Sequence, residues 1–394
     1  MENKRVYFDN AATTMVDRRV LEHMLPFFSE HYGNASSLHL EGIKAYQVVE
    51  WSRNQLAQLV QAQPEEIYFT SGGTESNNFA IKGLARSSKK RHIITSPIEH
   101  PAVLKTAQSL AREGFTLSFL PIDNKGIVKV EELESMITPN TLLVSVMLGN
   151  NEVGTIQPLK ELSLITRSKG VLLHSDAVQA VGNMPVDVKD LGVDLMSISA
   201  HKFYGPKGIG ALFVRKGTNL LPLLDGGEHE QGKRSGTYNT PGIAGLGKAC
   251  EIALQEMDEF VPRISTLRDD LINKILHQIP EAYINGDLKN RLPGNVHLSL
   301  PYVEGEALLL RLDDAGFAVS TGSACSAHNL KISHVLKAMS TDVLCAQGSL
   351  RISLGRHNKQ EDIDAFVQVL ADVARDLRQM SPLYRASKEG DRHV

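Results

Sequence analysis

Residues 142–199 contain three short apolar runs, LLVSVM (142–147), VLLHS (171–175) and DLMSIS (194–199). Each run has the length of a buried strand rather than that of a helix. The stretch 158–169, between the first two runs, has the spacing of an amphipathic helix. Strands that alternate with helices predict a mostly parallel sheet covered by helices on both faces.

The same alternation extends in both directions along the chain. Further strands are predicted at 66–70, 92–95 and 211–215, with helices at 75–85 and 100–113. After a long helical zone, 241–279, strands are predicted at 295–300, 317–320 and 349–354, with helices at 304–315 and 360–380. A chain of 394 residues is too long for one ordinary core. We therefore expect an α/β protein with a large domain, 15–264, and a smaller α/β domain formed by 1–14 and 265–394.

The composition is that of an ordinary globular protein and narrows the classes of function. The net charge of −3 gives no general reason to expect nucleic acid or an anionic membrane as a partner. No apolar run approaches the length of a signal segment or a membrane span. The three cysteines, Cys250, Cys325 and Cys345, are far apart and form neither a disulfide framework nor a zinc motif. We expect a cytoplasmic protein without a metal site.

Of two segments at strand ends, one could bind an anion and the other could bind a ring nitrogen. Residues 70–75, TSGGTE, follow a strand and open a helix, where glycines, free N–H groups and hydroxyls suit a phosphate. The alternative for this segment is an ordinary N-cap. Asp176 lies at the tip of the strand 171–175, where a carboxylate can hold a pyridinium proton or can simply cap a helix.

The segment 197–208, SISAHKFYGPKG, places Lys202 just beyond a buried strand. A lysine in such a turn can form a Schiff base, and burial near other cations would lower its pKa. The alternative is a solvated loop lysine. Lys202 follows Asp176 by about one βα unit, so the two side chains could face one pocket.

Two other strand ends carry polar residues. His100 begins a helix and could stack on a planar ring and move protons near neutral pH, or it could serve only as a cap. Asn151 follows the strand 142–147 and offers an amide donor, or it is a turn residue.

Two residues near the C-terminus complete the candidates. Cys325 lies in STGSACSAH (320–328), a run of small residues that predicts a surface loop and a reactive thiol. Cys250 and Cys345 have helix-like apolar surroundings and are expected in the core. Arg351 alternates within a strand, and its planar fork suits a substrate carboxylate or an ordinary ion pair.

Taken in order, these segments resemble the cysteine desulfurases of the NifS/IscS group, which are fold-type I pyridoxal-phosphate enzymes. The resemblance runs from residue 7 to residue 385, and its motifs are SGGTESNN, SPIEH, NNEVGTIQP, HSDAVQAVG, SISAHKFYGPKGIGAL, KRSGT, STGSACS and RISLGR. The likeness implies a cofactor-binding large domain and a small domain that carries the cysteine loop.

The resemblance also implies a role for each candidate residue. The catalytic residues are Lys202 as the Schiff-base lysine, Cys325 as the sulfur acceptor and His100 stacked on the ring. Asp176 would pair with the pyridinium nitrogen, and Asn151 and Gln179 with the phenolic oxygen. The phosphate ligands would be Gly73, Thr74, Ser199, His201 and, from a second subunit, Thr237. Asn34 and Arg351 would hold the substrate carboxylate.

The implied reaction converts L-cysteine to L-alanine and leaves the sulfur on Cys325 as a persulfide. The implied partners are a second copy of the chain and an iron–sulfur scaffold or sulfur-carrier protein, with tRNA thiolation as a further destination. The alternatives are a selenocysteine lyase, another pyridoxal-phosphate enzyme of this fold, or a sulfur-carrier scaffold without activity. Lys202 and Asp176 argue against the scaffold, because a binding protein has no use for a Schiff base.

Overall fold

The computed structural model describes residues 5–321 and 332–390 of the chain. Its largest sheet has seven strands in the order β2-β8-β7-β6-β5-β3-β4. Strand β8 is antiparallel to both of its neighbours, and the other pairs are parallel. The prediction of a mostly parallel α/β sheet is confirmed. The strands are β2 (Ile67–Thr70), β3 (His92–Thr95), β4 (Thr116–Phe119), β5 (Thr141–Ser145), β6 (Leu172–Asp176), β7 (Leu195–Ser199) and β8 (Gly210–Val214).

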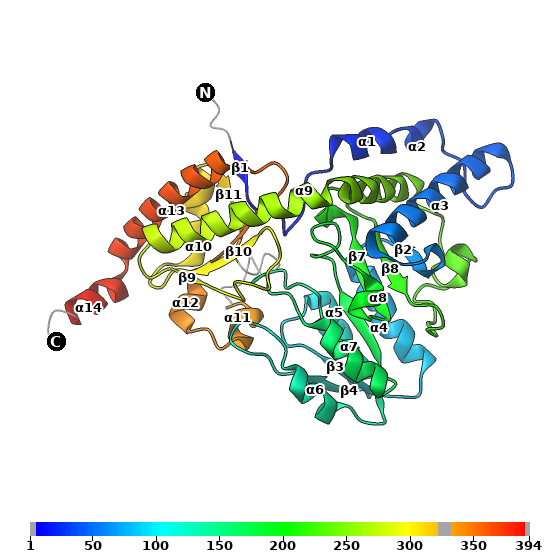
Figure 1. Ribbon diagram of the computed structural model, residues 1–394, viewed down its shortest axis with the longest axis horizontal. Helices are drawn as coiled ribbons and strands as arrows, with labels where there is room; N and C mark the ends of the chain where they lie inside the picture. Colours follow the sequence, from blue (N-terminus) through cyan, green and yellow to red (C-terminus); the bar gives the residue numbers. More distant parts are fainter. Residues whose placement is uncertain (1–4, 322–331, 391–394) are drawn as a thin grey trace.

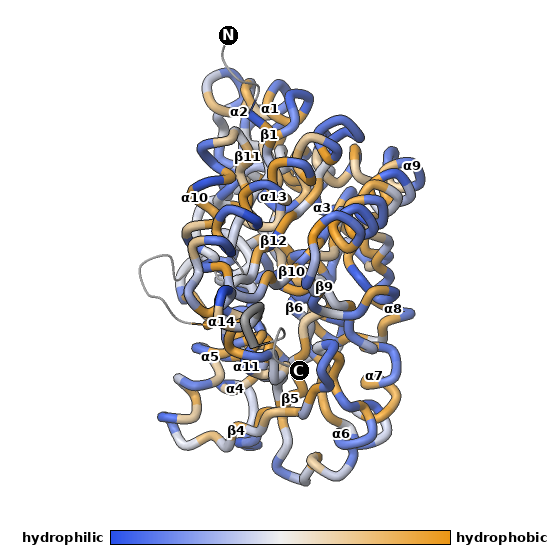
Figure 2. Tube along the Cα trace, turned by 90° about the vertical axis from the view of Figure 1, so that its left-hand side faces the viewer, coloured by the Kyte–Doolittle hydropathy of each residue, from blue (hydrophilic) through white to orange (hydrophobic). Residues whose placement is uncertain are grey.

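Helices surround this sheet, and most of them bury apolar side chains in its core. They are α1 (Arg18–Met24), α2 (Pro26–Ser29), α3 (Leu40–Val60), α4 (Gly73–Ser87), α5 (Pro101–Arg112), α6 (Val130–Met136), α7 (Leu159–Ser168) and α8 (Val188–Leu191). Strands β2, β3, β5, β7 and β8 are buried along their whole length. Figure 2 shows polar and apolar stretches alternating along the outer helices, which is the pattern of helices with one face on a core.

A second group of elements gathers the two ends of the chain. Strand β1 (Val6–Tyr7) pairs in parallel with β11 (Phe317–Ala318), and β10 (Asn295–Ser299) lies between β9 (Tyr283–Ile284) and β12 (Ser349–Ser353), antiparallel to both. The helices of this group are α10 (Gly305–Asp314), α11 (His334–Ala338), α12 (Val343–Gln347), α13 (Gln360–Met380) and α14 (Pro382–Gly390).

The long helix α9 (Thr240–Gln278) joins the two groups (Figure 1). Its first half, up to Ala253, packs into the core under the large sheet, and its second half, from Phe260, packs into a separate core with β10, β12 and α13. We propose the domain division expected from the sequence, 15–264 against 1–14 and 265–394, and the change of core along α9 supports it. Among the described residues, no helix is long and apolar enough to cross a membrane.

The structure also has elements that the patterns did not predict. Strand β4 lies at the edge of the sheet with half-exposed residues, so its sequence lacks the apolar run of a buried strand. Helices α6, α11 and α12 have seven residues or fewer, which is too short for a clear helical period.

Candidate active site

A cavity of about 300 Å³ opens at the carboxyl ends of β5, β6 and β7, the edge of a parallel sheet at which ligands bind. Most of the residues that the sequence singles out line it: Gly73, Thr74, His100, Asn151, Asp176, Gln179, Ser199, His201, Lys202 and Arg351. Asn34 lies outside this lining, in the exposed loop before α3, where its Oδ1 accepts a hydrogen bond from Ser36 N. Thr237 is exposed in the segment before α9 and does not line the cavity, and Cys325 lies outside the described residues.

Lys202 enters the cavity from a single 3₁₀ turn, Ala200–Lys202, that follows β7 directly. Its Nζ donates hydrogen bonds to the carbonyl oxygens of Ala11 and Ala12, each at 2.7 Å. The Ala11 carbonyl also accepts from Gln179 Nε2 at 2.9 Å. The N-terminal segment therefore forms one wall of the cavity and orients the amine.

Asp176 is the last residue of β6, and its carboxylate is held at both oxygens. Asn77 Nδ2 donates to Oδ2 at 2.7 Å, and Val178 N donates to Oδ1 at 3.1 Å. Asn77 is buried on α4, and among the described residues its own Oδ1 has no partner. Donors on both oxygens hold the carboxylate at one fixed position on the cavity wall.

The start of α4 forms a cradle beside this carboxylate. Gly72 precedes the helix with φ +147°, a backbone region that favours glycine, and no side chain caps the first turn among the described residues. A Cβ on Gly73 would lie 2.7 Å from Val178 Cγ2, so glycine permits the close approach of α4 to the loop after β6. Thr74, Ser199 and His201 border the same hollow. Free N–H groups and a helix dipole at such a place suit an anion.

Two of the three histidines that line the cavity, His100 and His201, are held neutral. Burial, reinforced by Lys202, lowers the pKa of His100, although Asp176 acts in the opposite direction. His100 caps α5, with Nδ1 accepting from Ala102 N at 3.1 Å, so the proton of the neutral ring lies on Nε2. Burial, then Lys202 and Lys207, lowers the pKa of His201 to about 4. Both rings therefore offer neutral imidazole groups at physiological pH.

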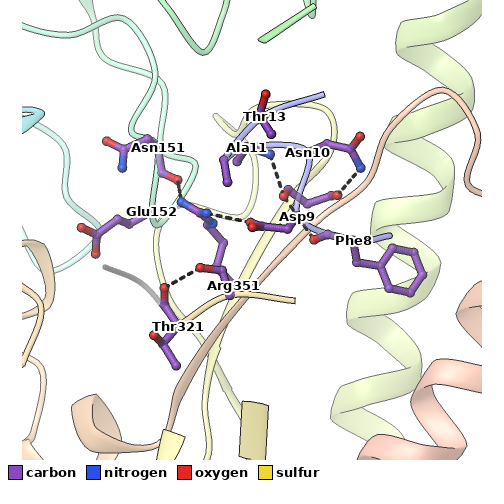
Figure 3. Close-up of polar contacts among 12 residues, drawn as sticks. Phe8, Asp9, Asn10, Ala11, Thr13, Asn151, Glu152, Thr321 and Arg351 are labelled. Carbon is purple, nitrogen blue, oxygen red and sulfur yellow. Dashed lines mark hydrogen bonds and ion pairs between the residues drawn. The ribbon is translucent and has the colours of Figure 1, made fainter. Parts of the chain in front are cut away.

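Arg351, on β12, also lines the cavity. Figure 3 shows its guanidinium between Asn151 and Asp9. Its Nη1 donates to the carbonyl oxygen of Asn151 at 3.0 Å, and its Nη2 pairs with Asp9 Oδ1 at 2.8 Å. The guanidinium is buried, and its Nε has no partner among the described residues. The arginine is thus fixed in place with a counter-ion on one side and the cavity on the other.

Some lining residues were not predicted from the sequence. They are Ala11, Ala12, Asn77, Pro101, Met147, Glu152, Val178 and His334. Asn77 could have been predicted from the sequence, because it lies four residues after Gly73 and therefore on the same side of α4. Ala11 and Ala12 act through backbone carbonyls, for which the sequence carries no signal.

The residues present fit pyridoxal phosphate. Lys202 offers an amine for the aldehyde, Asp176 offers a carboxylate oxygen as acceptor for a ring N–H, and the uncapped start of α4 offers N–H groups for the phosphate. Among the described residues, no group of three or more His, Cys, Asp or Glu side chains could hold a metal ion.

The chain is similar to well-known proteins along nearly its whole length. A family model for class-V aminotransferases matches residues 6–366. The chain is 49% identical over 386 residues to a protein named cysteine desulfurase IscS from Clostridium botulinum, covering 97% of each chain. It is 48% identical over 381 residues to a protein of the same name from Dictyoglomus turgidum, covering 96% of this chain and 97% of that one. A solved structure named NifS-like protein superposes with a TM-score of 0.88 at 43% identity, over 94% of this chain and 99% of that one. The chain therefore belongs to the aminotransferase class-V family.

Proposed function

We propose that this chain is a pyridoxal-phosphate-dependent cysteine desulfurase, which converts L-cysteine to L-alanine and transfers the sulfur to one of its own cysteines. The observation that carries the proposal is that Lys202, Asp176 and the open start of α4 border one cavity, with Arg351 at its far end. The relatives named cysteine desulfurase, which match at 48–49% identity over 96–97% of this chain, support this choice within the family.

We assign the cofactor-binding roles to this chain's residues as the resemblance implies. Thr74, Ser199, His201 and the backbone at Gly73 would hold the phosphate, with Thr237 of a second subunit. Asp176 would accept the ring N–H, and Asn151 and Gln179 would bind the phenolic oxygen. When bound, pyridoxal phosphate supplies an aldehyde that links to amines and a ring that withdraws electrons from the α-carbon of the substrate.

The other residues position the substrate and move its protons. Arg351 would bind the carboxylate of L-cysteine, and Lys202 Nζ would take the α-proton and return it. Asn34, which lies outside the cavity lining, is assigned to the same carboxylate on the resemblance alone. His100 presents its Nε2–H to the cavity, and it could accept a second proton only at Nδ1, by releasing Ala102 N. As a proton acceptor for a thiol it would therefore have to give up its cap on α5.

We assign the sulfur acceptor to Cys325. In the transfer, a thiolate attacks the sulfur of the substrate, a sulfur–sulfur bond replaces the carbon–sulfur bond, and the carbon left behind takes a proton to give alanine. Cys250 is buried in α9, and burial raises the pKa of its thiol. Cys345 is half-buried on α12 rather than in the core, and burial, then Asp342, raises the pKa of its thiol too. Neither thiol ionises readily, which favours Cys325 as the nucleophile.

We also propose that the chain forms a homodimer. Exposed apolar side chains cluster between residues 15 and 46, among them Phe28 at 62%, Tyr32 at 74% and Leu38 at 94% exposure. A monomer seldom leaves so many large apolar groups in water over one segment. We propose a cytoplasmic location, since three widely spaced cysteines suit a reducing compartment, and an iron–sulfur scaffold or sulfur-carrier protein as the final acceptor.

The proposal is tested by incubating the purified holoenzyme with L-cysteine and measuring alanine and protein-bound sulfur. One persulfide per alanine, located on Cys325 by peptide mass spectrometry, is the expected result. Alanine without a persulfide, or a persulfide on Cys250 or Cys345, would contradict it. Parallel assays with L-selenocysteine separate a selenocysteine lyase, which would release selenide but no sulfide.

A further inference from the structure

Glu152 is a buried acid that lines the cavity and has no role in the chemistry described so far. It lies in the turn after β5, where its backbone N donates to Asn150 Oδ1 at 2.9 Å. Its carbonyl oxygen accepts from Asn295 Nδ2 at 3.0 Å. Only 3% of the residue is exposed. These two hydrogen bonds hold the backbone of Glu152 in place, next to the end of β5, and the residue lines the cavity from there.

The contacts of Ser333 decide where a proton on Glu152 would lie. Ser333 Oγ accepts from Val335 N at 3.1 Å and from Leu336 N at 3.4 Å, because Ser333 caps α11. Its single hydroxyl proton is then left for Glu152 Oε2, with which it forms a hydrogen bond. Since Oε2 is an acceptor in this contact, the acid proton belongs on Oε1. Among the described residues, Oε1 has no hydrogen-bond partner.

Burial favours this neutral form, whereas the charge of Arg351 opposes it. Arg351, which lines the same cavity, is the cation whose charge acts on Glu152, and Asp9 already pairs with Arg351 at 2.8 Å. The other titratable groups of the cavity wall are His100, Asp176, His201, Lys202 and His334. Burial raises the pKa of Glu152 to about 7, although Ser333 and Arg351 act in the opposite direction. A substrate carboxylate brought to Arg351 would add a further negative charge, which opposes ionisation of a neighbouring acid.

We propose that Glu152 acts as a neutral carboxylic acid and that its Oε1–H donates a hydrogen bond to the carboxylate of the bound amino acid beside Arg351. The inference rests on the proposed function, because it takes the substrate carboxylate to lie at Arg351. Arg351 is already paired with Asp9, so it holds a second carboxylate less well. A neutral donor beside it adds affinity without adding charge. Substrate affinity is then linked to the proton on Glu152.

The test is the pH dependence of L-alanine binding to the holoenzyme, followed by its visible absorbance, in the wild type and in Glu152→Gln. Glutamine keeps an oxygen for Ser333 and offers an N–H to the cavity at every pH. The affinity of the wild type relative to the variant should fall about tenfold between about pH 6 and pH 8, as the acid ionises. Protonation of the substrate amine and of Lys202 affects the wild type and the variant equally, so it does not change the ratio of their affinities. A ratio that stays constant, or a variant that is weaker throughout, would overturn the proposal.

Two controls sharpen this experiment. Ethylamine, which is L-alanine without its carboxylate, should bind with a ratio that does not change with pH. Glu99→Gln removes another buried acid of this region, which is not part of the cavity lining and whose Oε1 accepts from Ser96 Oγ and Met147 N. This variant should keep the pH dependence of the wild type. A pH dependence that disappears in Glu99→Gln would assign the titration to Glu99 instead.

A second measurement covers the case in which Glu152→Gln does not fold. In the Glu99→Gln holoenzyme, the infrared band of a protonated carboxylic acid should disappear with a midpoint near pH 7, the pKa that burial gives Glu152, and L-alanine should move that midpoint upward. The absence of such a band would overturn the proposal. Sulfur transfer from L-cysteine, measured on the same wild-type sample, shows separately whether the proposed function itself fails.

Discussion

The two ends of the cavity are built in different ways. At the cofactor end, Asp176 and Lys202 lie at the tips of neighbouring strands of one sheet, and the cradle at the start of α4 follows a third strand of the same sheet. At the substrate end, Arg351 comes from β12 of the other group of elements and is held by Asp9 and Asn151, which lie 342 and 200 positions away in the chain. The side chains of the cofactor end come from one sheet, and from outside it the Ala11 and Ala12 carbonyls of the N-terminal segment contact Lys202. The substrate end takes Arg351 itself from the other group of elements, so it depends on the packing of the two groups.

Because of this difference, we expect substitutions at the two ends of the cavity to have different effects. Changes at the cofactor end should remove the reaction while the fold of both groups persists, because Asp176 and Lys202 line the cavity and are part of neither apolar core. Changes at the substrate end should alter affinity, because they affect a charge network that spans the two groups.

The largest effect is expected from Lys202→Ala at the cofactor end. Removing the amine that would hold the cofactor and move the α-proton should lower the rate of alanine formation by about 10³-fold or more. The visible absorbance of the lysine-bound cofactor should vanish with it. Lys160→Ala, which removes an exposed lysine paired with Asp190, is the matched control and should keep both signals. An unchanged spectrum in Lys202→Ala would refute the assignment.

A smaller effect, on affinity, is expected at the substrate end. Arg351→Lys cannot span the Asn151 carbonyl and Asp9 while also binding a carboxylate, so KM for L-cysteine should rise about 10- to 100-fold with a smaller change in kcat. Asp9→Asn removes the competing anion and should lower KM by about threefold. If both variants change kcat and leave KM alone, the carboxylate does not bind at Arg351.

The next effect concerns stability beneath the cofactor end. Burial raises the pKa of Glu99 to about 8, far above the value of about 4.3 for an unfolded chain. The folded protein therefore keeps a proton that the unfolded chain loses, and this stabilisation, complete below about pH 4, is lost as the pH rises to about 8. In Glu99→Gln the free energy of unfolding, relative to the wild type, should increase by up to about 1.4 kcal/mol per pH unit over that window. Urea unfolding at several pH values measures the free energy of unfolding of both proteins. If the two free energies change with pH in the same way, Glu99 is not protonated in the folded protein.

The smallest effect is expected for the cap that His100 provides to α5. His100→Asn keeps a good N-cap and should change the free energy of unfolding by less than about 0.5 kcal/mol, whereas His100→Ala should cost about 1 kcal/mol. Both variants lose the Nε2–H donor of the cavity, so they should lose activity alike. Equal stability of the two variants would mean that the Ala102 contact does not stabilise the helix.

The cofactor end could be predicted from the sequence because its signals are local. Apolar runs mark β5, β6 and β7, and the polar residue that follows each run must emerge at the same edge of a parallel sheet. Asp176 and Lys202 were found in this way, and the structure places both on one cavity.

The substrate end could be predicted only in part. Arg351 was identified by its type and its place in a strand, but its pairing with Asp9 depends on how the chain termini meet. Glu152 reads as an ordinary turn residue in the sequence, and its partner Ser333 lies 181 positions away. Contacts of this kind follow from tertiary packing, for which a single sequence has no periodic signal.

The central claim is that Lys202 holds pyridoxal phosphate at the tip of β7. Reducing the holoenzyme with borohydride fixes the cofactor to the lysine that carries it, and peptide mass spectrometry then locates it. We predict the modification on Lys202. Finding it on Lys207 or on any other lysine, or finding no lysine modified, would contradict the claim.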